Sequence, residues 1–513
     1  MLAKTFGSAV YGVEAITITI EVNVSSGAHI FIVGLPDNAI KESIQRVESA
    51  IKTIGFSMPR TKVVINLAPA DIRKSGSAFD LPIALAMLVA SEQLENAEKI
   101  SEYVIMGELN LDGMVNPIKG ALPIAITTYD EKFKGLILPV QNSREAAVVN
   151  NLNVYGVSHL RDVIEFFKDE KTLPRVRVSA KEEFAEAQTQ FDLDFNDVKG
   201  QMNIKRALEI AAAGGHNVIL IGPPGAGKTM LAKRMPTILP PLSLKEALET
   251  TKIHSVAGKL PSNSTLVSKR PFRTPHHTIS DIALVGGGSN PQPGEISLAH
   301  NGILFLDELP EFKRTVLEVL RQPIEERKIV VSRARISIEF PSNFMLIASM
   351  NPCPCGYYTH PEKECTCPPG GVLKYLNRIS GPLLDRIDLH VEVSPVTYSE
   401  LSESHVSEPS AQIRKRVIEA RRIQEERFRD VAEVHCNAMT TSNMLNEFCK
   451  IDKAGHNLLK TAMKRLNLSA RAYDRILKVG RTIADLDLSP AIRPDHVAEA
   501  IQYRSLDREG WAG

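Results

Sequence analysis

The sequence lacks three features that would place it in a special class of protein. It has no excess charge, with 61 lysines and arginines against 60 aspartates and glutamates, which excludes binding to nucleic acid through the whole surface. Its longest apolar stretch, residues 81–90, is far shorter than the roughly 20 residues of a membrane-spanning helix. Six cysteines in 513 residues are too few for a disulfide scaffold.

The amino terminus also lacks a basic region followed by a long apolar core, as a signal peptide would have. We therefore expect a cytoplasmic protein with no membrane partner. Composition is otherwise ordinary, since 43% hydrophobic and 24% charged residues are typical of a soluble globular protein. At about 150 residues per domain, the length predicts two to four domains.

Changes in pattern divide the chain into three folded units and two linkers. The first unit alternates strand-like and helix-like runs, the second begins with a strand, a glycine-rich loop and a helix, and the third is helical, with N-caps expected at Ser442, Ser469 and Ser489. Both linkers are polar. The predicted fold class is multidomain α/β with a helical carboxy-terminal unit. The predicted order is a first domain at 1–170, a linker at 171–190, a second domain at 191–395, a linker at 396–412 and a helical domain at 413–513.

Residues 222–229 satisfy the phosphate-binding pattern G-x-x-x-x-G-K-[ST]. An apolar strand precedes the loop and a helix follows it, as this motif requires. Glycines allow backbone N–H groups to surround phosphate oxygens, Lys228 reaches the β and γ phosphates, and the Thr229 hydroxyl ligates magnesium. The predicted ATP-binding residues are Gly222, Pro223, Pro224, Gly225, Ala226, Gly227, Lys228 and Thr229.

A second apolar strand, at 303–306, ends in two carboxylates. Buried strands rarely end this way without a functional reason. We expect Asp307 to hold magnesium and Glu308 to act as the general base that activates water. Together with the phosphate loop, this pair predicts nucleotide hydrolysis.

Three further polar residues are candidates for the catalytic site. Asn351 follows an apolar strand at 344–350, where a neutral side chain could orient water against the γ-phosphate. Arg386 and Arg471 are candidate cations for the charge that develops in the transition state. A lone arginine is, however, more often part of a surface ion pair.

Two segments are basic although the chain as a whole is nearly neutral. Residues 252–280 hold five lysines or arginines, three histidines and no acid, and residues 327–335 hold four basic residues and no acid around a predicted β-hairpin. Such segments can track phosphates without regard to base sequence, or they can be solvated loops balanced by acids elsewhere. The predicted DNA-binding residues are Lys269, Arg270, Arg273, Arg327, Lys328, Arg333 and Arg335.

Four cysteines, Cys353, Cys355, Cys365 and Cys367, fall in a loop at 353–367 that is rich in glycine and proline. Four thiolates suit a tetrahedral zinc ion, and a loop without its own core would gain order from the metal. An iron–sulfur or redox role and unliganded thiols are the alternatives. The remaining two, Cys436 and Cys449, are expected to pack as small apolar residues.

On these motifs the chain is identified as a member of the magnesium-chelatase-like family of AAA+ ATPases, with its strongest resemblance to the branch that acts in competence. The matching segments lie at 197–201, 211–217, 273–278, 301–308, 351–356 and 378–386. The resemblance implies an AAA+ core with a helix-2 insert and a pre-sensor-1 hairpin, both pointing into a ring pore, and a helical lid. It also implies that Asn351 is sensor 1, Arg386 an arginine finger acting on a neighbour in a homo-hexamer, and Arg471 sensor 2.

Residues 1–170 resemble the domain shared by Lon-type proteases and the ribosomal-S5-like fold, at 74–80 and 107–118. Lon-type enzymes use a serine nucleophile and a lysine base, but the aligned positions hold Ala78 and Leu122, which cannot perform this chemistry. Ser77 and Lys119 lie nearby and leave a shifted pair open. We expect a scaffold, or a module that binds DNA or a partner.

Three functions follow from these resemblances. The first is an ATP-dependent DNA motor with helicase or branch-migration activity on single-stranded and branched DNA, which serves natural transformation and homologous recombination beside recombination or competence proteins. The second is a chelatase-type ATPase that remodels a partner for metal insertion. The third, an ATP-dependent protease, lacks its catalytic pair at the aligned positions.

Overall fold

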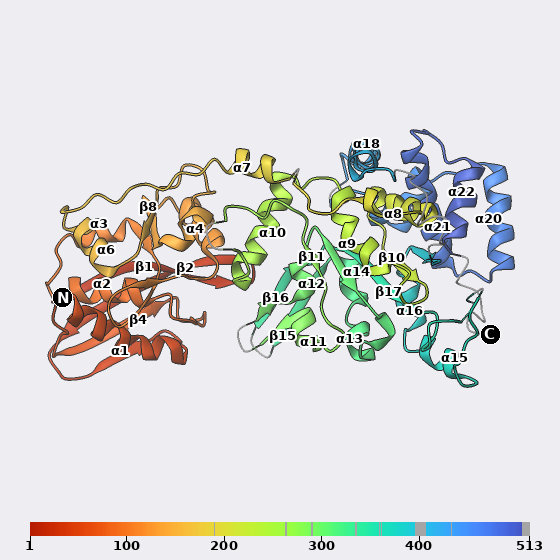
Figure 1. The fold of residues 1–513 in the computed structure, drawn as a ribbon. Helices are drawn as coiled ribbons and strands as arrows, with labels where there is room; N and C mark the ends of the chain where they lie inside the picture. Colours follow the sequence, from red (N-terminus) through yellow and green to blue (C-terminus); the bar gives the residue numbers. More distant parts are fainter. Residues whose placement is uncertain are drawn as a thin grey trace.

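The computed structural model describes residues 1–504 except 189, 262–263, 289–290, 334–335, 359, 361, 396–406 and 432. Three units follow one another along the molecule: an α/β domain, a second α/β domain around a parallel sheet, and a helical region (Figure 1). The predicted multidomain α/β class with a helical carboxy-terminal region agrees with this arrangement. Within the described residues, no helix is both long enough and apolar enough to cross a membrane.

The amino-terminal domain is built on a seven-stranded mixed sheet. Successive side chains along a strand point to opposite faces of the sheet. Leu136 and Leu138 belong to one core cluster, whereas Ile137 between them belongs to another on the opposite face. Helices cover both faces, with α1 (Asn38–Thr53) and α2 (Asp80–Ala90) on one and α4 (Ala121–Asp130) on the other. The strands in sheet order are β3 (Ile30–Val33), β4 (Lys62–Ala68), β2 (Glu14–Ser25), β1 (Leu2–Tyr11), β5 (Tyr103–Ile105), β8 (Gly135–Pro139) and β9 (Val154–Val157).

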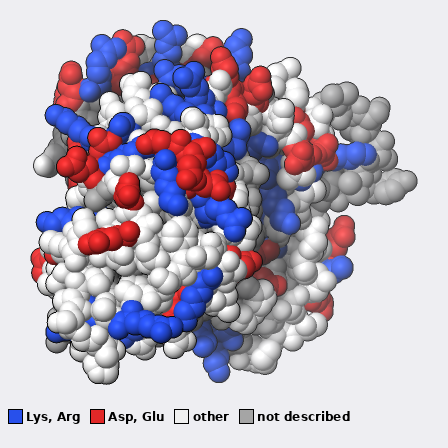
Figure 2. All heavy atoms as spheres, turned by 90° about the vertical axis from the view of Figure 1, so that its left-hand side faces the viewer, with Lys and Arg blue, Asp and Glu red and all other residues white. Residues whose placement is uncertain are grey.

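Charge is mixed on the face of the molecule that looks out from this domain. Figure 2 shows acidic and basic side chains interspersed there, beside a broad area of uncharged residues. Among the residues coloured in that view, no patch of a single sign dominates. This face therefore does not have the basic character expected of a large surface for nucleic acid.

The second domain contains a five-stranded sheet in which every pairing is parallel. Successive strand residues point to opposite faces, so both faces are apolar, as a buried parallel sheet requires. One face packs on α8 (Met202–Gly214) and α9 (Lys228–Ile238), and the other on α13 (Arg314–Glu318) and α14 (Arg321–Glu326). The strands in sheet order are β11 (Phe272–Arg273), β14 (Ile303–Leu306), β17 (Met345–Met350), β10 (Val218–Ile221) and β18 (Leu389–Glu392).

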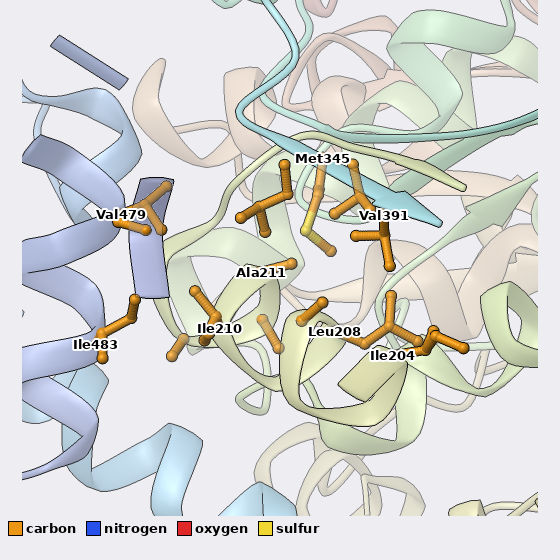
Figure 3. Packing of buried hydrophobic residues seen from close by; sticks show 14 of the residues in the cluster. Ile204, Leu208, Ile210, Ala211, Met345, Val391, Val479 and Ile483 are labelled. Atoms are coloured by element: carbon orange, nitrogen blue, oxygen red, sulfur yellow. The ribbon is translucent and has the colours of Figure 1, made fainter. Parts of the chain in front are cut away.

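The helical region shares a core with the second domain. In Figure 3, Val479 and Ile483 of α21 (Ala470–Leu486) lie opposite Ile210 of α8, in the cluster that also contains Met345 and Val391. The region consists of α18 (Ser410–Arg427), α19 (Ser442–Phe448), α20 (Lys453–Arg465), α21 and α22 (Pro494–Gln502). The parallel sheet therefore has the helical region on the same face as α8 and α9.

Helix ends differ from the sequence expectation in two places. Ser469 caps α21 by accepting the backbone N–H of Ala472 at 3.2 Å, as expected. Ser442 instead lies inside α19, which Thr441 precedes, and its hydroxyl donates to Asp474. Ser489 begins no helix, because α22 starts after Arg493.

The segment expected to be a linker, 171–190, includes the short helix α7 (Ala180–Ala187). Ala180 and Phe184 pack with Leu122 of the first domain and with Leu248 of α10 (Leu244–Ala257) in the second. This helix therefore helps to join the two domains. Most of the segment at 396–412 lies outside the described residues.

Candidate functional site

The candidate site lies where three parallel strands end. Because β10, β14 and β17 run in the same direction, the residues that follow them gather at one edge of the sheet. These residues are Gly222, Asp307 and Asn351. The loop at 222–227 then leads into the amino terminus of α9, which adds a partial positive charge.

Lys228 lies at the centre of this edge and is buried. Its ammonium donates to the carbonyls of Gly222 at 2.6 Å and Pro223 at 2.9 Å, and to Oδ1 of Asn351 at 3.0 Å. Burial lowers the pKa of Lys228, although Asp307 and Glu308 oppose the shift. Gly225 has φ of +79°, and a Cβ built there would meet nothing within 4 Å, so the loop borders open space. These features fit the phosphates of a nucleotide.

Thr229 and Asp307 meet as a magnesium site would require. The Thr229 hydroxyl donates to Oδ2 of Asp307 at 2.7 Å, and Ser349 of β17 donates to the other carboxylate oxygen. Hydroxyl and carboxylate oxygens are the donors that Mg²⁺ prefers. The sequence prediction did not include Ser349, although a polar residue within an otherwise apolar strand was a signal for it.

Glu308 is exposed and has φ of +54°, an unusual conformation for a residue other than glycine. Backbone strain of this kind is concentrated at functional sites. His277 lies beside it, with Nδ1 3.7 Å from Oε2 of Glu308, and its ring is tilted by 34° against that of His276, with ring centroids 4.1 Å apart. His277 belongs to one of the motifs that carry the family resemblance, but no role was predicted for it.

Arg386 lies at the opposite edge of the sheet. It precedes β18, and nearby Asp388 accepts the backbone N–H of Asn217, the residue before β10, at 2.9 Å. The four-residue strand β10 separates this edge from the phosphate loop by about 13 Å. Arg386 is buried, with Nε 2.8 Å from Glu325.

Arg471 lies with Arg386 and not with the phosphate loop. Its guanidinium is 3.5 Å from Asp385, the residue before Arg386, and remains largely exposed. Arg475, one turn along α21, pairs with Asp388 at 3.0 Å. Burial alone would raise the pKa of Asp388, but Arg475 and His216 hold it well below its usual value. The structure thus brings Lys228, Thr229, Asp307, Glu308 and Asn351 together and places both predicted arginines elsewhere.

The four cysteines of the loop at 353–367 form one cluster, with all four sulfur atoms within 4.8 Å of one another. Three separations are 3.2 Å, 3.7 Å and 3.5 Å, among Cys353, Cys355 and Cys365. Tetrahedral zinc with sulfur ligands at about 2.3 Å requires sulfur–sulfur distances of about 3.8 Å. Burial would raise the pKa of Cys355, but the N–H of Tyr357 and the neighbouring thiols lower it to about 5, whereas burial raises the pKa of Cys353 and of Cys367. The cluster thus favours one thiolate, the form in which cysteine binds a metal.

The cysteine loop packs directly on the phosphate loop. Gly356 has φ of +85°, and a Cβ built there would lie 2.4 Å from Cδ of Pro224. Cys353 is fully buried and is two residues from Asn351, so the cluster also fixes the end of β17. The sequence predicted both loops but not their contact.

The basic residues predicted to bind DNA have different environments. Arg270 donates to the carbonyls of Pro240 at 2.7 Å and Asn301 at 2.8 Å and pairs with Glu246, so its guanidinium is occupied inside the protein. Arg273 pairs with Glu295 through two hydrogen bonds, at 2.6 and 2.8 Å. These bonds argue against DNA contact by either arginine, because both guanidiniums already have partners.

The predicted hairpin is present as β15 (Lys328–Arg333) paired with β16 (Ile336–Pro341). At its base, Arg327 donates to the carbonyl of Phe344 at 2.8 Å. Lys328 is exposed and pairs with Glu339 at 3.0 Å, and Lys269 is exposed above the ring of Phe191. The side chain of Arg333 and all of Arg335 lie outside the described residues.

In the amino-terminal domain, Ser77 and Lys119 contact different residues. Ser77 donates to Glu108, whereas the side chain of Lys119 lies against Gly258 in the second domain. Ala78 and Leu122, at the aligned positions, pack in two apolar clusters. The shifted pair is therefore not assembled in this structure.

Comparisons with known proteins agree with these features. Family models described as magnesium chelatase, subunit ChlI, as subunit ChlI of Mg-chelatase, and as the carboxy-terminal part of subunit ChlI match residues 194–401, 20–142 and 407–504. Competence protein ComM of Haemophilus influenzae is 44% identical over 510 residues, which cover 99% of this chain and 98% of that protein. Protein YifB of Escherichia coli is 45% identical over 506 residues, covering 98% and 96%. The magnesium-chelatase 38 kDa subunit of Rhodobacter capsulatus is 26% identical over 185 residues, covering 32% and 52%.

Proposed function

Since this chain belongs to the magnesium-chelatase-like family of AAA+ ATPases, we propose that it is a hexameric motor that uses ATP hydrolysis to move along single-stranded and branched DNA. The work is helicase or branch-migration activity during homologous recombination and natural transformation. The name of its relative ComM, a competence protein, supports the second setting. ATP and magnesium are the cofactors that the family implies.

The observation that carries the proposal is the separation of Lys228 from Arg386 and Arg471. A guanidinium at the opposite edge of the sheet from its own phosphate loop serves a nucleotide only if a neighbouring subunit presents that nucleotide. Arg386 would then exchange Glu325 for the neighbour's γ-phosphate. Repetition of this contact closes a ring with ATP between subunits.

The chemistry at the site uses residues of both subunits. Lys228 and the backbone N–H groups of the loop hold phosphate oxygens, and magnesium held by Thr229 and Asp307 would neutralise charge on them. Glu308 accepts a proton from the attacking water, and Asn351 orients that water. Arg386 stabilises the negative charge of the transition state.

The hairpin β15–β16 supports DNA as the substrate. It projects from the core on the side nearer the amino-terminal domain in Figure 1, and its sequence carries four basic residues in nine. Basic side chains on such a hairpin contact phosphates irrespective of base sequence. Arg333 and Arg335 are the residues we propose for this contact, with Lys328 and Lys269 as further exposed cations.

The test is ATP hydrolysis by the purified protein with and without single-stranded DNA at modest salt. DNA should bind and stimulate hydrolysis, and the affinity should fall as salt rises because counterions are released. Arg333→Glu with Arg335→Glu should abolish stimulation but leave basal hydrolysis largely intact. Failure of DNA to bind or to stimulate contradicts the motor, and equal loss of basal activity would make the hairpin structural.

Zinc is the metal we propose for Cys353, Cys355, Cys365 and Cys367, on the sulfur geometry described above. Replacement of Cys365 and Cys367 by serine should lower the zinc content of the purified protein. Cys449→Ser is the matched control, because this buried cysteine lies outside the cluster. Unchanged zinc content in the double variant would remove these residues as ligands.

A chelatase-type remodelling ATPase is the second candidate. Its support is the match of the second domain to the chelatase subunit. Against it, the chelatase relative aligns with only 32% of this chain, whereas ComM and YifB align with nearly all of it. The amino-terminal domain, which resembles that of Lon-type proteases without an assembled catalytic pair, is best interpreted as a scaffold.

A further inference from the structure

A cavity of about 80 Å³ lies at the edge of the parallel sheet opposite the phosphate loop. Residues that precede three strands line it: Gly215 before β10, Gly302 before β14, and Phe344 before β17. The helical region closes the other side with Arg421 of α18 and the segment 435–439. The cavity therefore lies between the second domain and the helical region.

Three arginines and one carboxylate line this cavity. Arg270 and Glu246 form an ion pair at 3.1 Å, so their charges offset each other. Arg327 and Arg421 have no ion pair with any residue that the structure describes. Within the part of the chain that the structure describes, these two positive charges thus have no carboxylate in contact with them in a half-buried space.

Several N–H groups of these two arginines are free to bond. Arg327 donates through Nη1 to the carbonyl of Phe344, and Arg421 donates through Nε and Nη2 to the carbonyl of Ala212. Among the described residues, no partner is found for Nε and Nη2 of Arg327 or for Nη1 of Arg421. Guanidinium groups in such a position suit the paired oxygens of phosphate or carboxylate.

The charges lie close enough to affect one another. Burial lowers the pKa of Arg327. Cys436 and Asp388 oppose this shift, whereas the positive charges of Arg475 and Arg421 add to it. Burial also lowers the pKa of Arg270, opposed by its partner Glu246 and assisted by the charge of Arg421. Arginine stays protonated in proteins, so an anion is the means of relieving this repulsion.

Volume limits the size of the anion. A cavity of about 150 Å³ holds a benzene ring, and this one has about half that volume. It has room for a tetrahedral oxyanion but not for a nucleoside. We propose that the cavity is a binding site for a phosphate-class oxyanion, held by Arg327 and Arg421, which links the base of the β15–β16 hairpin to the helical region.

The test measures binding of inorganic phosphate by calorimetry at constant ionic strength. A non-hydrolysable ATP analogue and Mg²⁺ are present in excess, so that the loop at 222–229, including its γ-phosphate position, is filled and cannot take the phosphate. Arg327→Gln and Arg421→Gln should each weaken phosphate binding by about tenfold or more, because each removes charge-assisted hydrogen bonds. Arg429→Gln is the control, because Arg429 is 73% exposed and follows α18 outside the cavity.

Each outcome decides the proposal. Loss of binding in the two cavity variants, with the control like the wild type, supports it, and equal binding by all four proteins overturns it. Binding of a short oligothymidylate at the cavity without binding of inorganic phosphate also overturns it, because the occupant is then a DNA phosphodiester.

A second measurement does not depend on the variants. Crystals of the wild-type protein soaked in selenate should show anomalous density within hydrogen-bonding distance of Arg327 and Arg421. If the variants fail to fold, this result alone supports the site, and the absence of density between the two arginines overturns it.

Discussion

At the scale of single residues, Arg386 is the residue on which the proposed assembly of subunits into a ring depends. In one chain it pairs with Glu325 at the edge of the sheet opposite Lys228. A residue that acts on its own nucleotide would have to cross about 13 Å of sheet. Action on a neighbour's nucleotide requires only that the Arg386 end of the sheet in one subunit packs against the phosphate loop of the next.

Mixing two inactive variants tests this arrangement. Lys228→Ala and Arg386→Ala should each lower ATP hydrolysis by at least about a hundredfold when assayed alone. A one-to-one mixture should recover up to about a quarter of wild-type activity, because intact phosphate loops then meet intact fingers at some interfaces. The measurement is steady-state phosphate release.

Arg429→Ala mixed with Lys228→Ala is the control for dilution by an inactive protein. It should keep about half of the activity, because Arg429 is remote from both edges of the site. Subunit exchange is followed separately, by energy transfer between dye-labelled copies of the two inactive variants. A mixture of these variants that exchanges subunits but stays inactive means that Arg386 does not act between subunits.

The residues at the ends of strands could be predicted from the sequence, but the hydrogen-bond and ion-pair partners of most arginines could not. Lys228, Asp307 and Asn351 could be found because each follows an apolar strand and parallel strands end together. Arg270 looked like a DNA contact in a run without acids, yet its partners, Pro240, Asn301 and Glu246, come from elsewhere in the chain. A local count of charge cannot detect bonds to carbonyls that only the fold brings near.

At the scale of elements, the contact of the cysteine loop with the phosphate loop should affect ATP binding. Gly356→Ala places a methyl group 2.4 Å from Cδ of Pro224, so one of the two loops must move. We expect ATP affinity to fall about tenfold and the melting temperature to decrease. Fluorescence titration with a labelled ATP analogue and thermal unfolding measure the two effects.

Gly370→Ala is the matched control for backbone strain. Gly370 has φ of +74°, close to the +85° of Gly356, but a Cβ there meets nothing within 4 Å. This variant should show only the cost of a left-handed residue, about 1 to 2 kcal/mol, with ATP affinity unchanged. Equal ATP affinity in both variants would show that the contact with Pro224 does not support the site.

Most elements could be predicted because the spacing of their apolar residues and the length of the segment indicate the same type of element. The strand expected at 303–306 is β14, the strand at 344–350 is β17, and the hairpin in 327–335 is β15–β16. Helix α7 was missed because its sequence is polar, and its few apolar residues pack on two other domains. A helix stabilised by distant partners leaves a weak local pattern.

At the scale of the whole molecule, Glu145 joins the first two domains. This buried carboxylate, in α5 (Val140–Ala146), accepts the N–H of Leu122 at 2.9 Å and the hydroxyl of Ser255 from α10. Burial raises the pKa of Glu145, although these hydrogen bonds oppose the shift. The junction is therefore most stable with the carboxyl protonated, and that stability is lost as pH rises through the raised pKa.

Glu145→Gln should remove this pH dependence. The amide oxygen can accept both hydrogen bonds without a charge, so the variant should be more stable than the wild type at pH 8, by about 1 kcal/mol for each unit of pKa shift. The difference should shrink towards pH 5. Thermal unfolding at several pH values measures it, with exposed Glu182→Gln as the control. A variant less stable than the wild type at pH 8 would contradict the account.

We propose that ATP hydrolysis in a ring of these subunits moves DNA. Conversion of a synthetic four-way junction into its duplex products, followed on a gel, measures this movement. The wild-type protein with ATP and Mg²⁺ should convert the junction, whereas Lys228→Ala, or the wild type with ADP, should bind the junction and leave it intact. Conversion that does not need ATP, or no conversion by a wild-type protein that hydrolyses ATP, would contradict the claim.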